Sequence, residues 1–192
     1  MDMDARIVRT RAALVGAAIA LVDEHDPDQI SMADIAAAAG ISRQAIYDHF
    51  TDRDHLLAEA AISRIREATR RDAGPTRVPA DGSPPQSLIV LMTHLLDHRV
   101  FYQRLLTGRT SAVVRDELTR HNRFHFERMM MLPGPGRNIP VHEQAELVTF
   151  LAGGSTALIV GWLTDDNKLS TARVMADRLW QLWTSLRPVA TG

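Results

Sequence analysis

Four residues between positions 42 and 47 carry hydrogen-bonding side chains suited to reading DNA. The run Ser42-Arg43-Gln44 is followed three residues later by Tyr47. An arginine can donate two hydrogen bonds to guanine O6 and N7, and a glutamine can pair in the same bidentate way with adenine. Hydroxyl groups such as those of serine and tyrosine commonly bind phosphate oxygens. This combination indicates contact with base edges and with the DNA backbone, provided that one helix face presents all four side chains.

The surrounding sequence, SMADIAAAAGISRQAIYDHF over residues 31–50, predicts the two short helices that would hold this face. Ser31 is a favourable N-cap, and Asp34 stands three residues later as the acid of a capping box. Gly40 is suited to the left-handed turn that would end the first helix, and Ser42 can cap the second. Two helices joined by a tight glycine turn form a helix-turn-helix.

Apolar residues within and before this segment predict how the two helices are fixed. Ala36 is small enough to let the helices cross closely, and Ile35, Ile41 and Ile46 supply the contacts between them. A preceding helix over 4–24 repeats apolar residues at helical spacing, so we expect it to cover the pair.

Two pairs of histidines are the other residues whose spacing could support chemistry. His94 and His98 are four residues apart, and so are His121 and His125. On a helix this spacing places both rings on one face, where they can hold a metal ion. If the two helices faced each other, four imidazoles would converge on a metal-sensing site. The alternative is four partly exposed histidines that bind no metal.

Signatures of enzymes and cofactors are otherwise missing from the sequence. It contains no cysteine, which excludes a disulfide scaffold, a cysteine-based zinc finger and a cysteine nucleophile. Its single lysine, Lys168, lies outside any GxxxxGK[ST] motif, so a P-loop is excluded as well. No GxSxG, HExxH or paired-carboxylate signature is present. We therefore expect neither a cofactor nor catalysis, and the histidine pairs are the only support for the remote alternative of a helical enzyme.

The chain as a whole predicts an all-α protein of two domains. A DNA-binding domain is expected over residues 1–50 and a helical effector-binding and dimerisation domain over 51–192, with a helix over 52–72 connecting them. Runs rich in Gly and Pro at 74–85 and 133–140 predict loops. A cap at Ser83 is expected to start the helix after the first of these loops. The later helices are expected at about 111–132, 142–164 and 170–186.

The N-terminal motifs resemble those of the TetR-type bacterial transcriptional regulators over about residues 9–60. The residues that carry the resemblance are Ile35-Ala36, Ala39-Gly40-Ile41-Ser42, Ile46-Tyr47, His49-Phe50 and Leu56-Leu57. The resemblance implies an N-terminal three-helix DNA-binding domain, a larger helical ligand-binding domain and a homodimer that binds a double-stranded DNA operator. It assigns DNA contacts to Arg43, Gln44, Tyr47, His49 and Arg53, with Ser31 and Met32 at the start of the first motif helix. Met32, Asp48 and Arg53 depart from the common family pattern, and Asp48 would repel phosphate.

The C-terminal half predicts a dimer interface and an effector cavity. The helices over 142–164 and 170–186 carry enough apolar surface for a four-helix interface between two protomers. A small, apolar or aromatic effector would bind among adaptable Met and aromatic side chains and release a repressor from its operator. The candidate lining residues are Met92, Leu95, His98, Phe101, Tyr102, Leu105, His121, Phe124, His125, Met129 and Trp162.

Charge and hydropathy limit the binding partners. The net charge is −1, and residues 1–72 carry nine arginines against thirteen acidic side chains. Non-specific DNA binding should therefore be weak, and recognition should depend on a few arginines. The acidic N-terminus is unlike a signal peptide. The most apolar window, 147–163, is shorter than a membrane span and is interrupted by glycine. These features favour a cytoplasmic protein without a membrane partner. An architectural DNA binder that lacks an effector is the remaining alternative.

Overall fold

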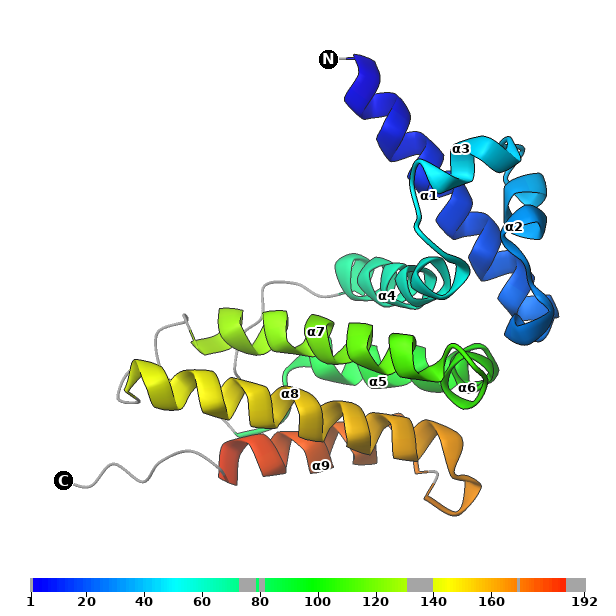
Figure 1. The fold of residues 1–192 in the computed structure, drawn as a ribbon. Coiled ribbons are helices and arrows are strands. Elements are labelled where there is room, and N and C mark those ends of the chain that lie inside the picture. Colours follow the sequence, from blue (N-terminus) through cyan, green and yellow to red (C-terminus); the bar gives the residue numbers. More distant parts are fainter. Residues whose placement is uncertain (1, 73–78, 80–81, 131–139, 169, 186–192) are drawn as a thin grey trace. The chain divides into compact units, whose positions relative to one another are not determined.

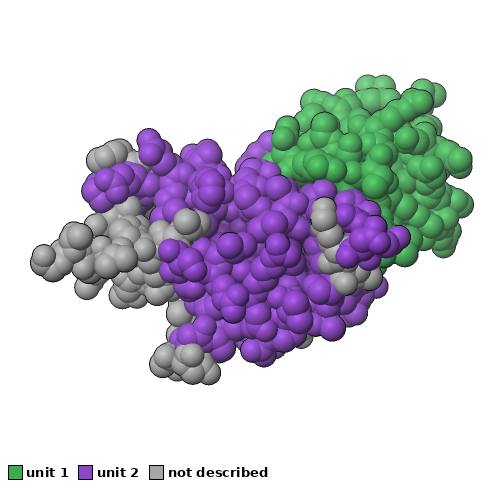
Figure 2. All heavy atoms as spheres, turned by 90° about the horizontal axis from the view of Figure 1, so that it is seen from below, with its two compact units in different colours: residues 1–67, 98–117 green, residues 68–97, 118–192 purple. Residues whose placement is uncertain are grey.

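The computed structural model describes residues 2–72, 79, 82–130, 140–168 and 170–185, and this part of the chain contains helices but no strand (Figure 1). The described residues cluster into two compact units, one of residues 1–67 and 98–117 and the other of 68–97 and 118–192 (Figure 2). The α-helices are α1 (Asp2–Glu24), α2 (Met32–Ala38), α3 (Arg43–Tyr47), α4 (Arg53–Asp72), α5 (Gln86–Asp97), α6 (Arg99–Thr107), α7 (Ser111–Met130), α8 (Val141–Thr164) and α9 (Ala172–Ser185).

The first unit combines α1–α3 and most of α4 with α6 and the start of α7. Helix α1 packs against α2 and also against α6. Of the residues predicted to fix the two helices, Ile35 and Ile46 are fully buried, Ala36 is almost so, and Ile41 is partly exposed. Leu14 and Val22 of α1 are fully buried as well. The helix-turn-helix is thus fixed by side chains that face away from solvent.

Local capping explains where the short helices begin and end. The Ser31 side chain accepts a hydrogen bond from the Asp34 backbone amide, and the Asp34 carboxylate accepts from the Ser31 amide, which confirms the predicted capping box. Gly40 has φ = 67°, the left-handed conformation expected of the turn. Ser42 accepts from the Ala45 amide and caps α3. Asp52 accepts from the His55 amide at the start of α4.

Two arginines connect the end of α1 to the elements packed on it within the first unit. The Arg104 guanidinium donates to the backbone carbonyls of Val22 and Asp23, at 2.6 and 2.7 Å, so it satisfies carbonyls that the last turn of α1 leaves without helical partners. Arg64 of α4 donates to the Asp23 carboxylate at 2.8 Å and lies over the Phe101 ring. Helix α6 is therefore part of the same compact unit as the helix-turn-helix.

The second unit is built on α5, α8, α9 and the last half of α7. Helices α5 and α9 pack together, and the Trp180 indole donates to the Gly82 carbonyl at 2.8 Å. The Trp183 indole donates to the Ser155 hydroxyl at 2.9 Å. An apolar cluster lies between α7 and α8 and consists of Phe126, Val148, Leu151 and Ala152, with Met129, Met130, Leu147 and Trp183 packed against it.

Two expectations about local structure are wrong. Helix α5 begins at Gln86 rather than at a Ser83 cap, because the Leu88 and Ile89 amides bond to the Pro85 carbonyl. The helix predicted to carry the His94/His98 pair ends one residue before His98. Helix α5 ends at Asp97, and His98 has φ = −108° and ψ = 27°, outside the α-helical region, before α6 begins.

Helix α8 is longer than the apolar window suggested. Over Glu143–Thr164 it is long and apolar enough to cross a membrane by length and composition alone. Half of that stretch is buried inside the protein, as for the core helix of a helical domain. The predicted loops at 74–85 and 133–140 fall largely outside the described residues.

Candidate nucleic-acid interface

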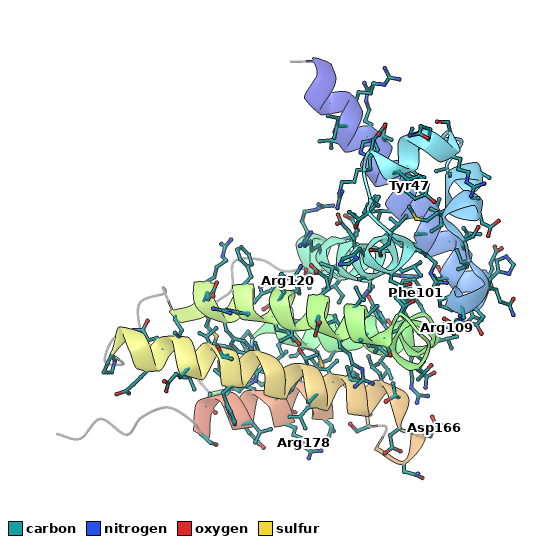
Figure 3. The ribbon with its side chains drawn as sticks, in the orientation of Figure 1. Tyr47, Phe101, Arg109, Arg120, Asp166 and Arg178 are labelled. Atoms are coloured by element: carbon teal, nitrogen blue, oxygen red, sulfur yellow. The ribbon has the colours of Figure 1, made fainter. Side chains whose placement is uncertain are left out.

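The exposed face of α3 holds the side chains predicted to read DNA. Ser42, Arg43 and Gln44 are exposed, and Tyr47 keeps 49% of its surface accessible one turn later. Tyr47 projects from α3 in Figure 3. Ile46 on the opposite side is fully buried, so the helix cannot rotate without exposing its apolar anchor. The structure therefore gathers these four polar side chains on one surface.

His49 and Arg11 lie at the end of this face, where Arg11 connects three elements. The Arg11 guanidinium donates to the His49 backbone carbonyl at 2.8 Å and forms an ion pair with Glu59 of α4. It also lies 4.1 Å from the centroid of the buried Phe50 ring. Its contacts hold α1, the end of α3 and α4 together, and the His49 side chain remains partly exposed.

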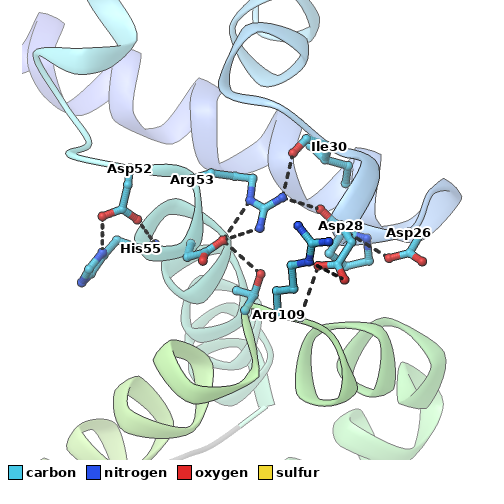
Figure 4. Close-up of polar contacts among 10 residues, drawn as sticks. Asp26, Asp28, Ile30, Asp52, Arg53, His55 and Arg109 are labelled. Carbon is cyan, nitrogen blue, oxygen red and sulfur yellow. Dashed lines mark hydrogen bonds and ion pairs between the residues drawn. The ribbon is translucent and has the colours of Figure 1, made fainter.

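Arg53 makes a dense set of contacts inside the first unit (Figure 4). Its guanidinium donates to the backbone carbonyls of Pro27 and Ile30, at 3.2 and 3.3 Å, and to the Asp54 carboxylate at 2.7 and 2.8 Å. The Thr110 hydroxyl donates to the same Asp54 oxygen. The structure thus places Arg53, which the family pattern assigns to DNA, in the connection between α4 and the segment before α2.

The two predicted residues at the start of α2 occupy structural positions. Met32 is only 9% exposed and belongs to the apolar core. The Ser31 hydroxyl takes part in the capping box, and it also donates to the Asp34 carboxylate at 2.7 Å. The Met32 side chain is therefore largely withdrawn from the surface, and the Ser31 hydroxyl is already bonded to Asp34.

Hydrogen bonding at the helix starts shifts the titration of two carboxyl groups. Bonds from the Ser31 side chain and backbone lower the pKa of Asp34. The His55 backbone amide lowers the pKa of Asp52, with a further contribution from the His55 ring. In α6, burial raises the pKa of Tyr102, so its hydroxyl stays protonated at neutral pH. The capping acids are therefore anionic where helix N-termini favour negative charge.

The structure divides the predicted effector-lining residues between the two units. His98, Phe101, Tyr102 and Leu105 belong to the first unit, where the last three are buried. In the second unit Met92, Leu95 and Trp162 are buried and Met129 is partly so. Phe124 lies on the surface with 55% exposure. Each unit thus holds its own part of the predicted set.

The histidines do not form the four-imidazole site. Across residues 2–72, 79, 82–130, 140–168 and 170–185, no three His, Asp or Glu side chains come together in one metal-binding cluster. The His98 Nδ1 atom lies 2.9 Å from the Arg64 guanidinium in the first unit. His121 and His125 remain close to each other on α7.

Several residues that hold the interface escaped the sequence analysis. Glu59 binds Arg11 across 48 residues, and Thr110 binds Asp54 across 56. No local pattern marks such partners, because their separation in sequence is unrelated to helix periodicity. The one signal that the sequence offered for such a partner was a charged residue, such as Glu59, on the mostly apolar face of α4.

Comparisons with known proteins agree with this geometry. Residues 14–60 match the family model of the bacterial regulatory proteins, tetR family, and residues 82–185 match a transcriptional regulator C-terminal region. The HTH-type transcriptional regulator BetI of Agrobacterium fabrum is 33% identical over 85 residues, which is 44% of this chain and 40% of BetI. An uncharacterized HTH-type transcriptional regulator of Mycobacterium tuberculosis, MT2310, is 27% identical over 88 residues, 46% of this chain and 43% of that protein. The matches thus span about two fifths of each relative's length.

Solved structures share the fold over nearly the whole chain. The dihydroxyacetone kinase operon activator DhaS has a TM-score of 0.60 at 15% identity, covering 92% of this chain and 94% of its own. A TetR transcriptional regulator from Rhodococcus sp. RHA1 has a TM-score of 0.59 at 18% identity, covering 92% and 97%. With two family models that match the helix-turn-helix and most of the C-terminal half, the chain belongs to the tetR family of bacterial regulatory proteins.

Proposed function

We propose that the protein acts as a homodimeric repressor in the cytoplasm, released from its operator by a small effector. The observation that carries the dimer is an exposed apolar surface on the two C-terminal helices. Phe150 of α8 is 64% exposed, and Val174 and Leu182 of α9 are 54% and 43% exposed. Large apolar side chains left exposed on two helices of one unit are what a surface that binds another protein would present.

The backbone beside Phe150 supports a helical partner. A Cβ atom built on Gly153, Gly154 or Gly161 would meet no atom within 4 Å, so open space borders α8 on this side. Small residues let a second helix approach closely, which suits the four-helix interface expected of α8 and α9 from two protomers. A two-fold dimer would also set two α3 helices about one DNA turn apart, at roughly 34–36 Å.

For DNA recognition we propose that Arg43 and Gln44 read base edges. Ser42, Tyr47 and His49 would bind the phosphate backbone at the same face. Arg53, Ser31 and Met32 would act indirectly, since their side chains hold α2 and α4 in place. The net acidity of residues 1–72 makes the exposed Arg6, Arg9 and Arg43 more important for affinity.

The effector would be apolar or aromatic, because the buried candidate residues in the second unit, Met92, Leu95 and Trp162, are apolar or aromatic. Its binding would favour a conformation that no longer fits the operator, and its effect is limited by its difference in affinity between the two conformations.

The test begins with selection of DNA sites from a random duplex library by the purified full chain. A dimeric regulator should select a two-fold sequence with half-sites centred about 10 base pairs apart or a multiple of that spacing. Small molecules that raise the thermal midpoint of the free protein are then added to the selected complex, and at least one should dissociate it. Selection of a single half-site would overturn the dimer, and retention of operator affinity with every stabilising molecule would overturn effector release.

A further inference from the structure

Two histidines on α7 bring their ring nitrogens together. His121 and His125 are one helical turn apart, and their Nε2 atoms are separated by 3.1 Å. The rings are not stacked, since their planes cross at 70° with centroids 4.5 Å apart. Two imidazoles that meet head-on along an N–H···N line would hold their centroids farther apart. At least one ring is therefore tilted away from the line that joins the two Nε2 atoms.

We propose that His121 and His125 chelate a divalent transition-metal cation through their Nε2 atoms. Histidine nitrogens bind such cations at about 2.0–2.1 Å. Two nitrogens 3.1 Å apart then form an angle of about 98° at the metal, between the octahedral and tetrahedral values. The separation of the two Nε2 atoms therefore matches that of two ligands on one metal ion.

The surroundings of the two rings favour an accessible site with a fixed ligand. His121 is only 8% exposed, so its ring is held by packing, whereas His125 is exposed and leaves a path from solvent. The next residue, Asn122, donates to the Thr156 hydroxyl of α8 at 3.0 Å, which fixes the rotation of α7 in the second unit. A cation that enters from water can reach the exposed His125 ring and also bind the His121 ring, which packing holds in place.

Water or an exogenous ligand would complete the coordination shell. Among the described side chains no third His, Asp or Glu joins the pair. Two of the nearest exposed charges on α7, Arg123 and Glu127, are paired with each other at 3.0 Å. In the metal-free protein one ring donates its Nε2 proton to the other, and metal binding requires that ring to carry its proton on Nδ1 instead.

The chain contains a matched control in His94 and His98. These residues have the same spacing in sequence, but His98 lies just beyond the end of α5, and its ring contacts Arg64. A site that depends on helical spacing should therefore need His125 and not His94. The inference does not depend on the proposed function, because the binding is measured without DNA or effector.

The experiment is calorimetric titration of the full chain, freed of any polyhistidine tag, with nickel chloride. One Ni²⁺ should bind per chain. His125→Ala should weaken binding about tenfold or more, whereas His94→Ala should change it less than about twofold. Because His125 is exposed, its replacement should leave the circular dichroism spectrum unchanged. His121→Gln, the buried partner, should weaken binding as His125→Ala does.

Equal affinity of the wild type and His125→Ala would overturn the proposal. Loss of binding in His94→Ala would do so as well, since it would place the ion elsewhere. A wild type that binds no Ni²⁺ at millimolar concentration would also reject it. In the Cu²⁺ form, electron paramagnetic resonance should show coupling to two nitrogens, and coupling to one in His125→Ala would support the chelate.

Discussion

At the residue scale, the arginines of the first unit fall into two classes that sequence alone does not separate. Arg43 is exposed on the α3 face, whereas Arg11 and Arg53 are partly buried and donate to backbone carbonyls and carboxylates of the first unit. An arginine bonded to such acceptors stabilises the fold, because removing it leaves those acceptors without a donor. The two classes should therefore differ in what their substitution changes.

Arg43→Ala should weaken operator binding without altering stability. Loss of a bidentate base contact costs about 1–3 kcal/mol, so affinity should fall about 5- to 150-fold for each half-site that the protein contacts. The discrimination at the contacted base pair should fall with it. The check is a fluorescence anisotropy titration with operator and single-substituted operators, alongside a thermal melt. Undiminished sequence preference would show that another side chain reads that base.

Arg53→Ala should lower the stability of the protein rather than its intrinsic affinity for the operator. Its bonds to Pro27, Ile30 and Asp54 are partly buried, and hydrogen bonds to charged groups are worth about 1.5–3 kcal/mol. We expect the free energy of unfolding, measured with urea, to fall by about 2 kcal/mol. Operator affinity should fall only through the unfolded fraction. If the free energy of unfolding were unchanged and DNA binding were weakened, Arg53 would instead belong to the arginines that contact DNA.

At the element scale, the sequence predicted the helix-turn-helix because its signals are local. The Ser31–Asp34 box, Gly40 and the Ser42 cap are each set by residues within three or four positions. The break at His98 was missed because no glycine or proline marks it. The grouping of α6 with the DNA-binding helices was also missed, because Arg104 reaches the end of α1 across more than 80 residues.

Gly40→Ala should destabilise the turn between α2 and α3. Gly40 has φ = 67°, and a Cβ there would meet no atom within 4 Å, so backbone strain is the only cost. That strain is about 1–2 kcal/mol for an L-residue. Thermal or urea unfolding measures it, and Gly40→Asn should cost less because asparagine tolerates this conformation better. Equal losses in the two variants would indicate that something other than φ sets the cost.

The capping acid of α2 predicts a pH dependence with a definite sign. Hydrogen bonds from Ser31 lower the pKa of Asp34 from its ordinary value of 3.8. A carboxyl group with a depressed pKa stabilises the fold above the pKa of the unfolded chain and loses that effect as pH falls through the folded value. The stability difference between wild type and Asp34→Asn should therefore be full at pH 6 and shrink below about pH 4. A stability difference between wild type and Asp34→Asn that stays constant across this pH range would contradict the stabilising role of the Asp34 carboxylate.

At the scale of the whole molecule, function depends on whether the exposed apolar face of α8 and α9 pairs two chains. Substitution of Phe150 by Glu would place a charge where the proposed interface excludes water, and an unpaired charge is costly to bury. We expect Phe150→Glu to sediment as a monomer at concentrations where the wild type is a dimer.

Phe124→Glu is the matched control for this last prediction, since Phe124 is a similarly exposed phenylalanine, at 55% against 64%, on α7 of the same unit. It should remain dimeric. If dimerisation positions two α3 helices on one operator, Phe150→Glu should also lose the two-site affinity while still binding an isolated half-site weakly, because the Ser42–Tyr47 face is untouched. Sedimentation velocity and binding to full and half operators separate the two effects. If Phe150→Glu remained dimeric, or if Phe124→Glu became monomeric, the interface would have to be assigned to α7 rather than to α8 and α9.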